Sequence, residues 1–346
     1  MRTPWTAPAC VSRPRPHCSA ACCTKPHAGS TPSGAAPRLR SDFRAARTLA
    51  LVVHLAYHMG LIGLPGSSAE PKAAAAGHYG CNFIGLNEES VMEREPSRIR
   101  LAHVPTPLEP LRRWRPNLWI KRDDMTGSEL AGNKVRKLEY LAAEALEQGA
   151  DTLVTVGDVQ SNHARATAGV AARLGLDCLL LLAGEAEPAE WCRGNAAVDR
   201  CFGAQLDWQP AGQPIAVRLQ HAAEVLRQQG RRPYLIPEGG SCELGLWGYI
   251  QAAAETKRQC DELGIRIDRV LCAVGSCGTY VGLLLGAKLH HWPVRVTGIG
   301  ISSSAERKVR SSLELARRTI ERYELPIDVS GEDLEVHDYA GLGYAR

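Results

Sequence analysis

The residue types that could carry chemistry gather at three places in the sequence, and each lies where a loop is expected to become a helix. The first place is Gly132, Asn133 and Lys134, directly before a stretch with the periodicity of an amphipathic helix. A rigid backbone at a helix start can present the amine of Lys134 to a bound aldehyde, as a Schiff base requires. The alternative is that Lys134 is one more cation on a solvated helix face, and the tripeptide alone does not exclude it.

The second place is the run Gln160, Ser161, Asn162 and His163, which follows the apolar residues that end at Val156. Backbone N–H groups at a helix start, together with Ser and Asn side chains, form a site that suits a substrate carboxylate. An ordinary helix N-cap is the alternative, and it needs only one of these residues. The run by itself leaves both interpretations open.

The third place is the turn Gly275, Ser276, Cys277, Gly278 and Thr279, between an apolar strand-like run and a helical one. Glycines permit close backbone approach, while successive N–H groups, hydroxyls and the helix dipole can hold a phosphate. A plain strand-to-helix turn is the alternative. The turn lacks the lysine of a P-loop and the GxGxxG of a dinucleotide fold, which favours a small phosphorylated cofactor over a nucleotide.

The elements that must position these three places are predicted by the texture of the chain after about residue 96. Short apolar runs alternate there with amphipathic stretches, which is typical of βαβ units around a mainly parallel sheet. The expected strands are 118–121, 152–156, 178–182, 234–236, 269–273 and 295–299. The expected helices are 133–148, 161–174, 194–201, 215–229 and 245–263, and a glycine follows several of them as a C-terminal cap.

Composition limits the function classes. The chain has 346 residues, 45% of them hydrophobic and 5% aromatic, which suffices for two globular layers of α/β type. Residues 1–91 hold 9 Lys and Arg against 4 Asp and Glu, whereas the remainder holds 32 against 33. The positive excess therefore lies in the N-terminal stretch, and the nearly neutral remainder argues against a nucleic-acid partner.

The 12 cysteines form no CxxC pair and accompany no run of histidines, so no metal site is expected. In a chain of this size they are interpreted as reduced thiols of a cytoplasmic enzyme. Cys178 and Cys272 lie in apolar strand-like runs, where a small buried hydrophobe is expected rather than a reactive thiol.

Residues 1–95 are interpreted as a disordered or spurious N-terminal extension. Residues 1–41 contain no Asp or Glu and many prolines, which should prevent packing and would also break the helix of a transit peptide. The apolar run 49–64 is short and contains His54 and His58, so neither a membrane span nor secretion is expected. Translation beginning at Met92 is the hypothesis that explains the whole stretch.

Seven segments follow one another from residue 106 onward: TPLEPL, IKRDD, GNKVRKLEYL, QSNHARATA, GGS, LGLWGYIQAA and GSCGT. In this order and spacing they resemble the D-cysteine desulfhydrase and 1-aminocyclopropane-1-carboxylate deaminase family of fold-type-II pyridoxal-phosphate enzymes, over residues 101–346. The resemblance implies a two-domain α/β fold of the tryptophan synthase β type with parallel-type sheets. A large cofactor domain would comprise 96–130 and 238–346, and a small domain 131–237.

The resemblance also implies the site. Lys134, beside Asn133, would carry pyridoxal 5'-phosphate as a Schiff base and act as general base. Asn162 would touch the ring oxygen, and Ser161 and His163 would hold the substrate carboxylate. The remaining residues so implied are Tyr344, beside the substrate, and Gly275, Ser276, Cys277, Gly278 and Thr279, around the phosphate.

The implied reaction is elimination of hydrogen sulfide from D-cysteine, with pyruvate and ammonia as the other products, by a homodimer. A cyclopropane deaminase and an L-cysteate sulfo-lyase remain alternatives. The sequence departs from the family at Ala131, where glycine or serine is usual, and it stops at Arg346, before a DPVY-containing and an HTGG-like segment. The C-terminal part is therefore expected to be missing, and an inactive fragment that binds only cofactor or a partner is an alternative of another class.

Overall fold

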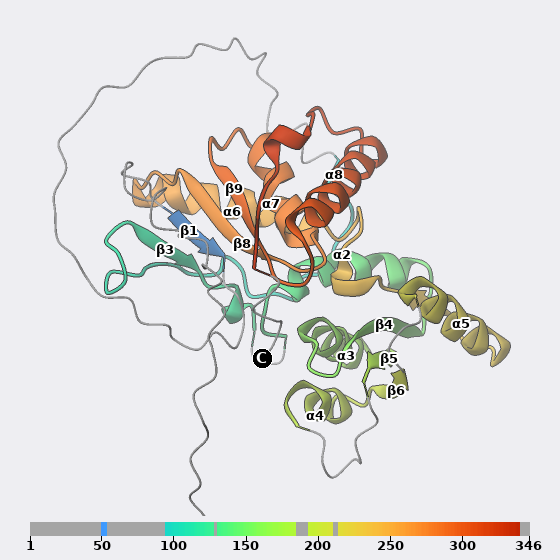
Figure 1. The fold of residues 1–346 in the computed structure, drawn as a ribbon. Helices are drawn as coiled ribbons and strands as arrows, with labels where there is room; N and C mark the ends of the chain where they lie inside the picture. The colour runs from blue at the N-terminus through green and yellow to red at the C-terminus, as the bar shows by residue number, and fades with distance from the viewer. Residues whose placement is uncertain (1–49, 54–93, 128–129, 185–192, 210–213, 340–346) are drawn as a thin grey trace, which may run out of the picture. The chain divides into compact units, whose positions relative to one another are not determined.

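Two sheets organise the chain (Figure 1). The computed structural model describes residues 50–53, 94–127, 130–184, 193–209 and 214–339, and all of these belong to one unit, Arg47–Arg346. The larger sheet has the strand order β10-β9-β8-β1-β3-β2. Its strands are β1 (Ala50–Val53), β2 (Leu108–Pro110), β3 (Leu118–Lys121), β8 (Arg269–Val274), β9 (Arg295–Gly300) and β10 (Glu335–Asp338). All neighbours in it are parallel except the antiparallel pair β2 and β3.

The smaller sheet has the order β6-β5-β4-β7 and is parallel throughout. Its strands are β4 (Thr152–Asp158), β5 (Asp177–Ala183), β6 (Gln205–Gln209) and β7 (Pro233–Leu235). The central strands β4 and β5 are buried along most of their length. Their continuous apolar runs are what a parallel strand covered on both faces requires.

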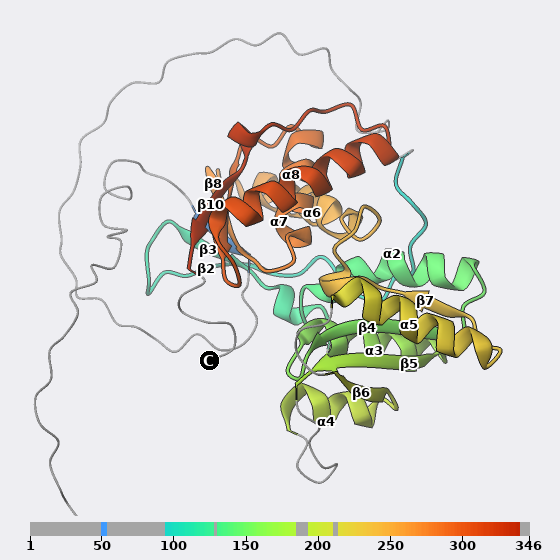
Figure 2. The same ribbon diagram turned by 45° about the vertical axis from the view of Figure 1, so that its right-hand side comes forward.

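Helices cover each sheet, and one helix contacts helices of both groups (Figure 2). The helices α3 (Asn162–Leu174), α4 (Gly194–Cys201) and α5 (Ile215–Gln228) contact strands of the smaller sheet. The helices α7 (Gly278–Leu289) and α8 (Ala305–Arg322) contact strands of the larger sheet, and α6 (Trp247–Leu263) packs on α7. The helix α2 (Lys134–Glu147) contacts both α3 and α6, so its first turn lies where the two groups of elements meet.

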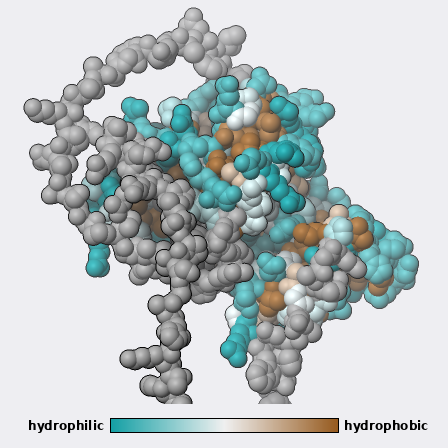
Figure 3. Space-filling view, in the orientation of Figure 1, coloured by the Kyte–Doolittle hydropathy of each residue, from teal (hydrophilic) through white to brown (hydrophobic). Residues whose placement is uncertain are grey.

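The sequence explains the different burial of these helices. Almost every residue of α7 is apolar and buried, whereas α8 buries one face, which includes Leu315 and Ala316. On the face drawn in Figure 3, hydrophilic residues alternate with apolar patches. Among the helices of the described ranges, none combines the length and the hydropathy that crossing a bilayer would require.

The six predicted strands and the five predicted helices are all present, with ends displaced by at most two residues. Glycines at positive φ follow α2, α3 and α6, as predicted, at Gly149, Gly175 and Gly264. The short strands β2, β6 and β10 and the long helix α8 were not predicted. The described cysteines are all free, and Cys178 and Cys272 are buried as expected.

Two short parts of the stretch 1–95, residues 50–53 and 94–95, lie within the described residues, and both contact later parts of the chain. The strand β1 pairs in parallel with β3 on one side and β8 on the other, so it is a central strand of the larger sheet. Its apolar, β-prone sequence ALVV suits that position. Arg94 donates to the carbonyl of Tyr323 over 3.1 Å, and Glu95 accepts from Tyr140 over 2.5 Å. The other residues of this stretch lie outside the described ranges.

Candidate functional site

Hydrogen bonds to two other segments of the chain fix the turn that carries Lys134. The hydroxyl of Thr126 accepts from the N–H of Gly132 over 2.9 Å, and Gly132 adopts a φ of 113°, which favours glycine. Asn133 then donates from Nδ2 to Oγ1 of Thr279 over 3.1 Å. This bond joins the lysine turn to the predicted phosphate-binding turn, although the two residues lie 146 positions apart.

The environment of Lys134 lowers the pKa of its amine to about 8. Burial is the main cause, and the negative charge of Glu238 acts in the opposite direction. Lys134 is also the first residue of α2, where the helix dipole disfavours a cation. The neutral amine, which a nucleophile or a general base requires, is therefore about a tenth of the total near pH 7, far more than for an ordinary lysine.

The turn at residues 275–279 has the backbone of an anion-binding site. It follows the carboxyl end of β8, and Cys277 adopts the left-handed conformation, with φ 67°, directly before α7 begins at Gly278. A left-handed residue directly before a right-handed helix can point successive N–H groups into one concavity. A side chain at Gly278 would collide with Ser241 and Lys137, which shows how closely other segments approach the turn.

Lys137 is a candidate site residue that the sequence analysis did not single out. Its Nζ donates to the carbonyl of Gly239 over 3.1 Å and to Oγ of Ser241 over 3.2 Å. The same Oγ of Ser241 lies 2.8 Å from Oγ of Ser276 and accepts from the N–H of Gly278 over 3.2 Å. A lysine amine of α2 therefore reaches the turn, although the turn's own sequence contains no lysine or arginine.

The charge of Lys137 has no carboxylate partner among the described residues. Its side chain is 1% exposed, and burial, reinforced by the charge of Lys134, lowers the pKa of its amine well below the usual range. A buried amine of this kind suits an anionic ligand that supplies the missing charge. The available signal was its position three residues after Lys134, on the same helix face.

The second motif forms a helix N-terminus, as both of its interpretations required. Oγ of Ser161 accepts from the N–H of Ala164 over 3.2 Å, so Ser161 is the N-cap of α3. One turn later, Arg165 donates to the carbonyl of Ala131 over 2.6 Å. The N-terminus of α3 is thereby bonded to the turn that carries Lys134, and all three predicted places come together.

The side chain of His163 does not point freely into this site. It is 3% exposed, and its Nε2 lies 2.8 Å from Oγ1 of Thr155, whose hydroxyl hydrogen goes to the carbonyl of Ile236. Nε2 must therefore carry the hydrogen, and Nδ1 is a buried acceptor with no partner among the described residues. Burial, and then the charges of Lys134 and Lys137, lowers the pKa of His163 well below its usual range, so the ring is neutral.

The predicted role of His163 in holding a substrate carboxylate stays a prediction. Tyr344 lies outside the described residues, so its predicted position beside the substrate stays a prediction.

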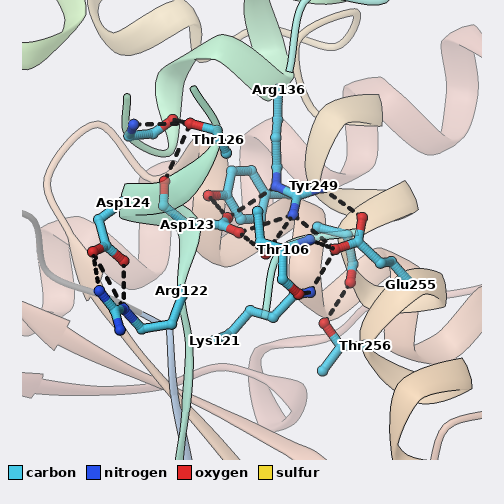
Figure 4. Close-up of polar contacts among 12 residues, drawn as sticks. Thr106, Lys121, Arg122, Asp123, Asp124, Thr126, Arg136, Tyr249, Glu255 and Thr256 are labelled. Carbon is cyan, nitrogen blue, oxygen red and sulfur yellow. Dashed lines mark hydrogen bonds and ion pairs between the residues drawn. The ribbon is translucent and has the colours of Figure 1, made fainter. Parts of the chain in front are cut away.

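A second polar cluster lies behind the lysine turn (Figure 4). Arg136 donates from its guanidinium to both oxygens of Asp123, over 2.8 and 3.0 Å, and to Glu255 over 2.9 Å. Lys121 donates to Glu255 over 2.5 Å and to the carbonyl of Thr106 over 2.7 Å. Two cations face two carboxylates, so this cluster fixes α2 against α6 and leaves no charge for a ligand.

A lysine amine of lowered pKa near a turn with anion-binding geometry suits a ligand that carries an aldehyde and a phosphate in one molecule. Nδ1 of His163 has no hydrogen-bond partner among the described residues, and the amine of Lys137 has no carboxylate partner there. Both could interact with such a ligand. The match to known proteins agrees with this class: the chain belongs to the family described as "pyridoxal-phosphate dependent enzyme", whose model matches residues 99–344. Its cofactor is pyridoxal 5'-phosphate.

Two curated relatives indicate which members of this family the chain is similar to. The chain is 38% identical over 264 residues to a putative 1-aminocyclopropane-1-carboxylate deaminase of Pyrococcus abyssi (strain GE5 / Orsay), covering 75% of this chain and 78% of the relative. It is 39% identical over 254 residues to the D-cysteine desulfhydrase of Klebsiella pneumoniae subsp. pneumoniae, covering 71% and 76%. The expected family is thereby confirmed.

Solved structures confirm the fold class. A crystal structure of an ACC deaminase homologue superposes with a TM-score of 0.66 at 33% identity, over 74% of this chain and 78% of that one. A fungal L-serine ammonia-lyase from Rhizomucor miehei shares the fold with a TM-score of 0.50 at 18% identity, over 68% of this chain and 76% of that one. The α/β architecture with parallel-type sheets that was expected for fold type II is therefore present.

Proposed function

We propose that this protein is a carbon–sulfur lyase that converts D-cysteine to hydrogen sulfide, pyruvate and ammonia. The observation that carries the proposal is the hydrogen bond between Asn133 and Thr279, which joins the segment that carries Lys134 to the anion-binding turn. The sequence similarity to a D-cysteine desulfhydrase supports the substrate. We further propose that the enzyme acts as a cytoplasmic homodimer, which sedimentation of the purified protein would test.

The cofactor would be held at three points. Its phosphate would bind the N–H groups and hydroxyls of the turn from Gly275 to Thr279, with Lys137 as counter-ion. Asn162 would contact the ring oxygen, and Lys134 would hold the aldehyde carbon. When bound, pyridoxal phosphate supplies an electron sink for a substrate that loses its Cα proton.

The residues of this chain would then position the substrate and move its proton. The N-terminus of α3, with the hydroxyl of Ser161, would bind the substrate carboxylate through charge-assisted hydrogen bonds. Nζ of Lys134 would take the Cα proton, because its pKa, lowered to about 8, makes the neutral base far more accessible than in an ordinary lysine. Expulsion of the thiolate from Cβ would follow from the resulting electron pair.

Two further substrates of the same group remain in competition. The similarity to a putative cyclopropane deaminase favours 1-aminocyclopropane-1-carboxylate as the second candidate. L-cysteate is disfavoured by Glu238, an exposed carboxylate whose charge acts on Lys134, because it would repel a substrate sulfonate. A neutral thiol side chain meets no such repulsion.

The test is a steady-state assay of the full chain with each candidate substrate. We expect pyruvate and sulfide from D-cysteine, with little 2-oxobutanoate from the cyclopropane and little sulfite from L-cysteate. Lys134→Ala should lower the rate by roughly three orders of magnitude or more, since both its roles are lost. The proposal fails if D-cysteine yields no sulfide, or if wild type and Lys134→Ala give the same absorbance spectrum with added pyridoxal phosphate.

A further inference from the structure

Asn195, at the start of α4, contacts the Asn162 side chain and has no role in the function proposed above. Its Nδ2 donates to the main-chain carbonyl of Gln160 over 2.8 Å and to Oδ1 of Asn162 over 3.0 Å. Its own N–H donates to Oε1 of Gln160 over 2.9 Å. Three hydrogen bonds therefore fix Asn195 against the residues that immediately precede and begin α3.

The chain reserves space for this contact. Gln160 also donates from Nε2 to the carbonyl of Arg193 over 3.0 Å, so its side chain lies across the start of α4. Gly194 adopts φ 57°, and a side chain there would collide with Oε1 of Gln160. The approach of α4 to the α3 N-terminus thus depends on a glycine directly before Asn195.

The bonds of Asn195 determine the orientation of two side-chain amides. The atom of Asn195 that faces the Gln160 carbonyl must be the nitrogen, since a main-chain carbonyl can only accept. The second hydrogen of that NH2 group points to Asn162, which must therefore present its oxygen. Nδ2 of Asn162 is left facing away from Asn195, and it has no acceptor among the described residues.

We propose that Asn195 is a positioning residue that makes Asn162 a pure hydrogen-bond donor towards the ring oxygen of the cofactor. This inference rests on the proposed function, in which Asn162 faces that oxygen. A pure donor stabilises the oxygen in its anionic form and disfavours the protonated hydroxyl, which would itself have to donate. Asn195 therefore acts on the cofactor's protonation state without contacting the cofactor.

The experiment compares Asn195→Asp with Asn195→Ala. An aspartate offers only acceptors, so it turns the Asn162 amide round and presents Oδ1, instead of Nδ2, to the ring oxygen. Asn195→Ala removes both contacts of the side chain, so the Asn162 amide can adopt either orientation. We expect Asn195→Ala to raise the dissociation constant for pyridoxal phosphate about two- to fivefold and Asn195→Asp at least tenfold more than that, roughly the effect of reversing one charge-assisted bond.

The absorbance of the bound cofactor gives the second readout. Titration with pH should show the protonated ring hydroxyl persisting to higher pH in Asn195→Asp than in wild type. Gln228→Ala, on the exposed end of α5, is the matched control and should change neither quantity. Circular dichroism shows whether each variant is folded.

A double-mutant cycle separates the amide orientation from the added negative charge. In an Asn162→Ala background, both substitutions at position 195 should lose their effect on cofactor affinity, because no amide remains to orient. A penalty of Asn195→Asp that persists there is a charge effect and overturns the inference. Equal losses for Asn195→Asp and Asn195→Ala in the wild-type background also overturn it, as a loop-anchoring role predicts.

The Asn195→Ala arm of the cycle keeps the test valid if Asn195→Asp does not fold. Additive effects of Asn195→Ala and Asn162→Ala would then contradict the inference, and coupled effects would support it. Failure of the inference and failure of the function are distinguishable. The inference alone fails if wild type binds pyridoxal phosphate and the cycle is additive, whereas both fail if wild type binds none.

Discussion

The first turn of α2 carries three cations within four residues, and they have opposite surroundings. Arg136 faces Asp123 and Glu255, so its charge is matched by two carboxylates in a buried cluster (Figure 4). Lys134 and Lys137 face the anion-binding turn, and no carboxylate is hydrogen-bonded to either among the described residues. The same helix thus has one cation that fixes the fold and two that are left for a ligand.

This difference shows which physical signature marks function. Burial raises the pKa of Asp123, but Arg136 and the hydroxyl of Tyr249 outweigh it, so the carboxylate stays ionised beside its partner. The lysine amines have the opposite balance, because burial prevails and lowers their pKa. A buried charge that lacks its counter-ion lowers stability unless a ligand completes it.

The largest expected effect follows from removing Arg136, the cation whose charge two carboxylates balance. Arg136→Met should lower the free energy of unfolding of the cofactor-free protein by about 3–5 kcal/mol, because Asp123 and Glu255 lose their shared cation inside the protein. Urea unfolding followed by circular dichroism measures this. Arg231→Met is the matched control: its ion pairs with Asp151 and Asp177 are partly exposed, so it should cost far less stability than Arg136→Met.

The next largest effect follows from removing Lys137, whose amine has no carboxylate partner among the described residues. Lys137→Met should leave the cofactor-free protein as stable as wild type or more so, because it removes a buried cation without a carboxylate partner. It should weaken pyridoxal phosphate binding about 10- to 100-fold, since a charged hydrogen-bond donor to the phosphate is lost. Absorbance titration and urea unfolding measure the two quantities. A loss of stability as large as that of Arg136→Met would contradict the comparison.

The sequence could predict the helix that carries these cations but not their roles. Hydrophobic periodicity and Gly149 give both ends of α2, and the glycine-rich turn before α7 indicates its chemistry. Nothing within α2 distinguishes Arg136 from Lys137, because the two partners of Arg136, Asp123 and Glu255, lie 13 and 119 positions away. The same limit applies to His163, whose partner Thr155 is set by the packing of β4 on α3.

The elements that were missed have weak local signals for related reasons. The strand β6, QLDWQ, alternates polar and apolar residues at the edge of its sheet, and β10, EVHD, is almost entirely polar. The strand β1 lies in the apolar run 49–64, which was considered only as a membrane span or signal segment, and its two neighbours, β3 and β8, define its place. Pairing with distant strands, which outweighs local propensity, accounts for all three.

A smaller effect tests Glu238, the carboxylate whose charge acts on the amine of Lys134. The rate at which the cofactor-free protein takes up pyridoxal phosphate should rise with pH around a midpoint near 8, because only the neutral amine of Lys134 can react. Glu238 stabilises the ammonium form, so Glu238→Gln should lower that pKa and shift the midpoint to lower pH. Stopped-flow absorbance gives the profile. Glu224→Gln, on the exposed surface of α5, should leave it unchanged, and an upward shift in Glu238→Gln would contradict the prediction.

The smallest effect concerns backbone strain at Cys277, in the anion-binding turn. Cys277 holds a left-handed conformation that costs a residue with a side chain about 1–2 kcal/mol relative to glycine. Cys277→Gly should therefore be more stable than Cys277→Ala by about 1 kcal/mol, since both lose the buried sulfur and only glycine relieves the strain. Urea unfolding of the two variants gives the difference. Equal stabilities would mean that the turn relaxes around any residue, and the anion-binding geometry would then not depend on strain stored at this position.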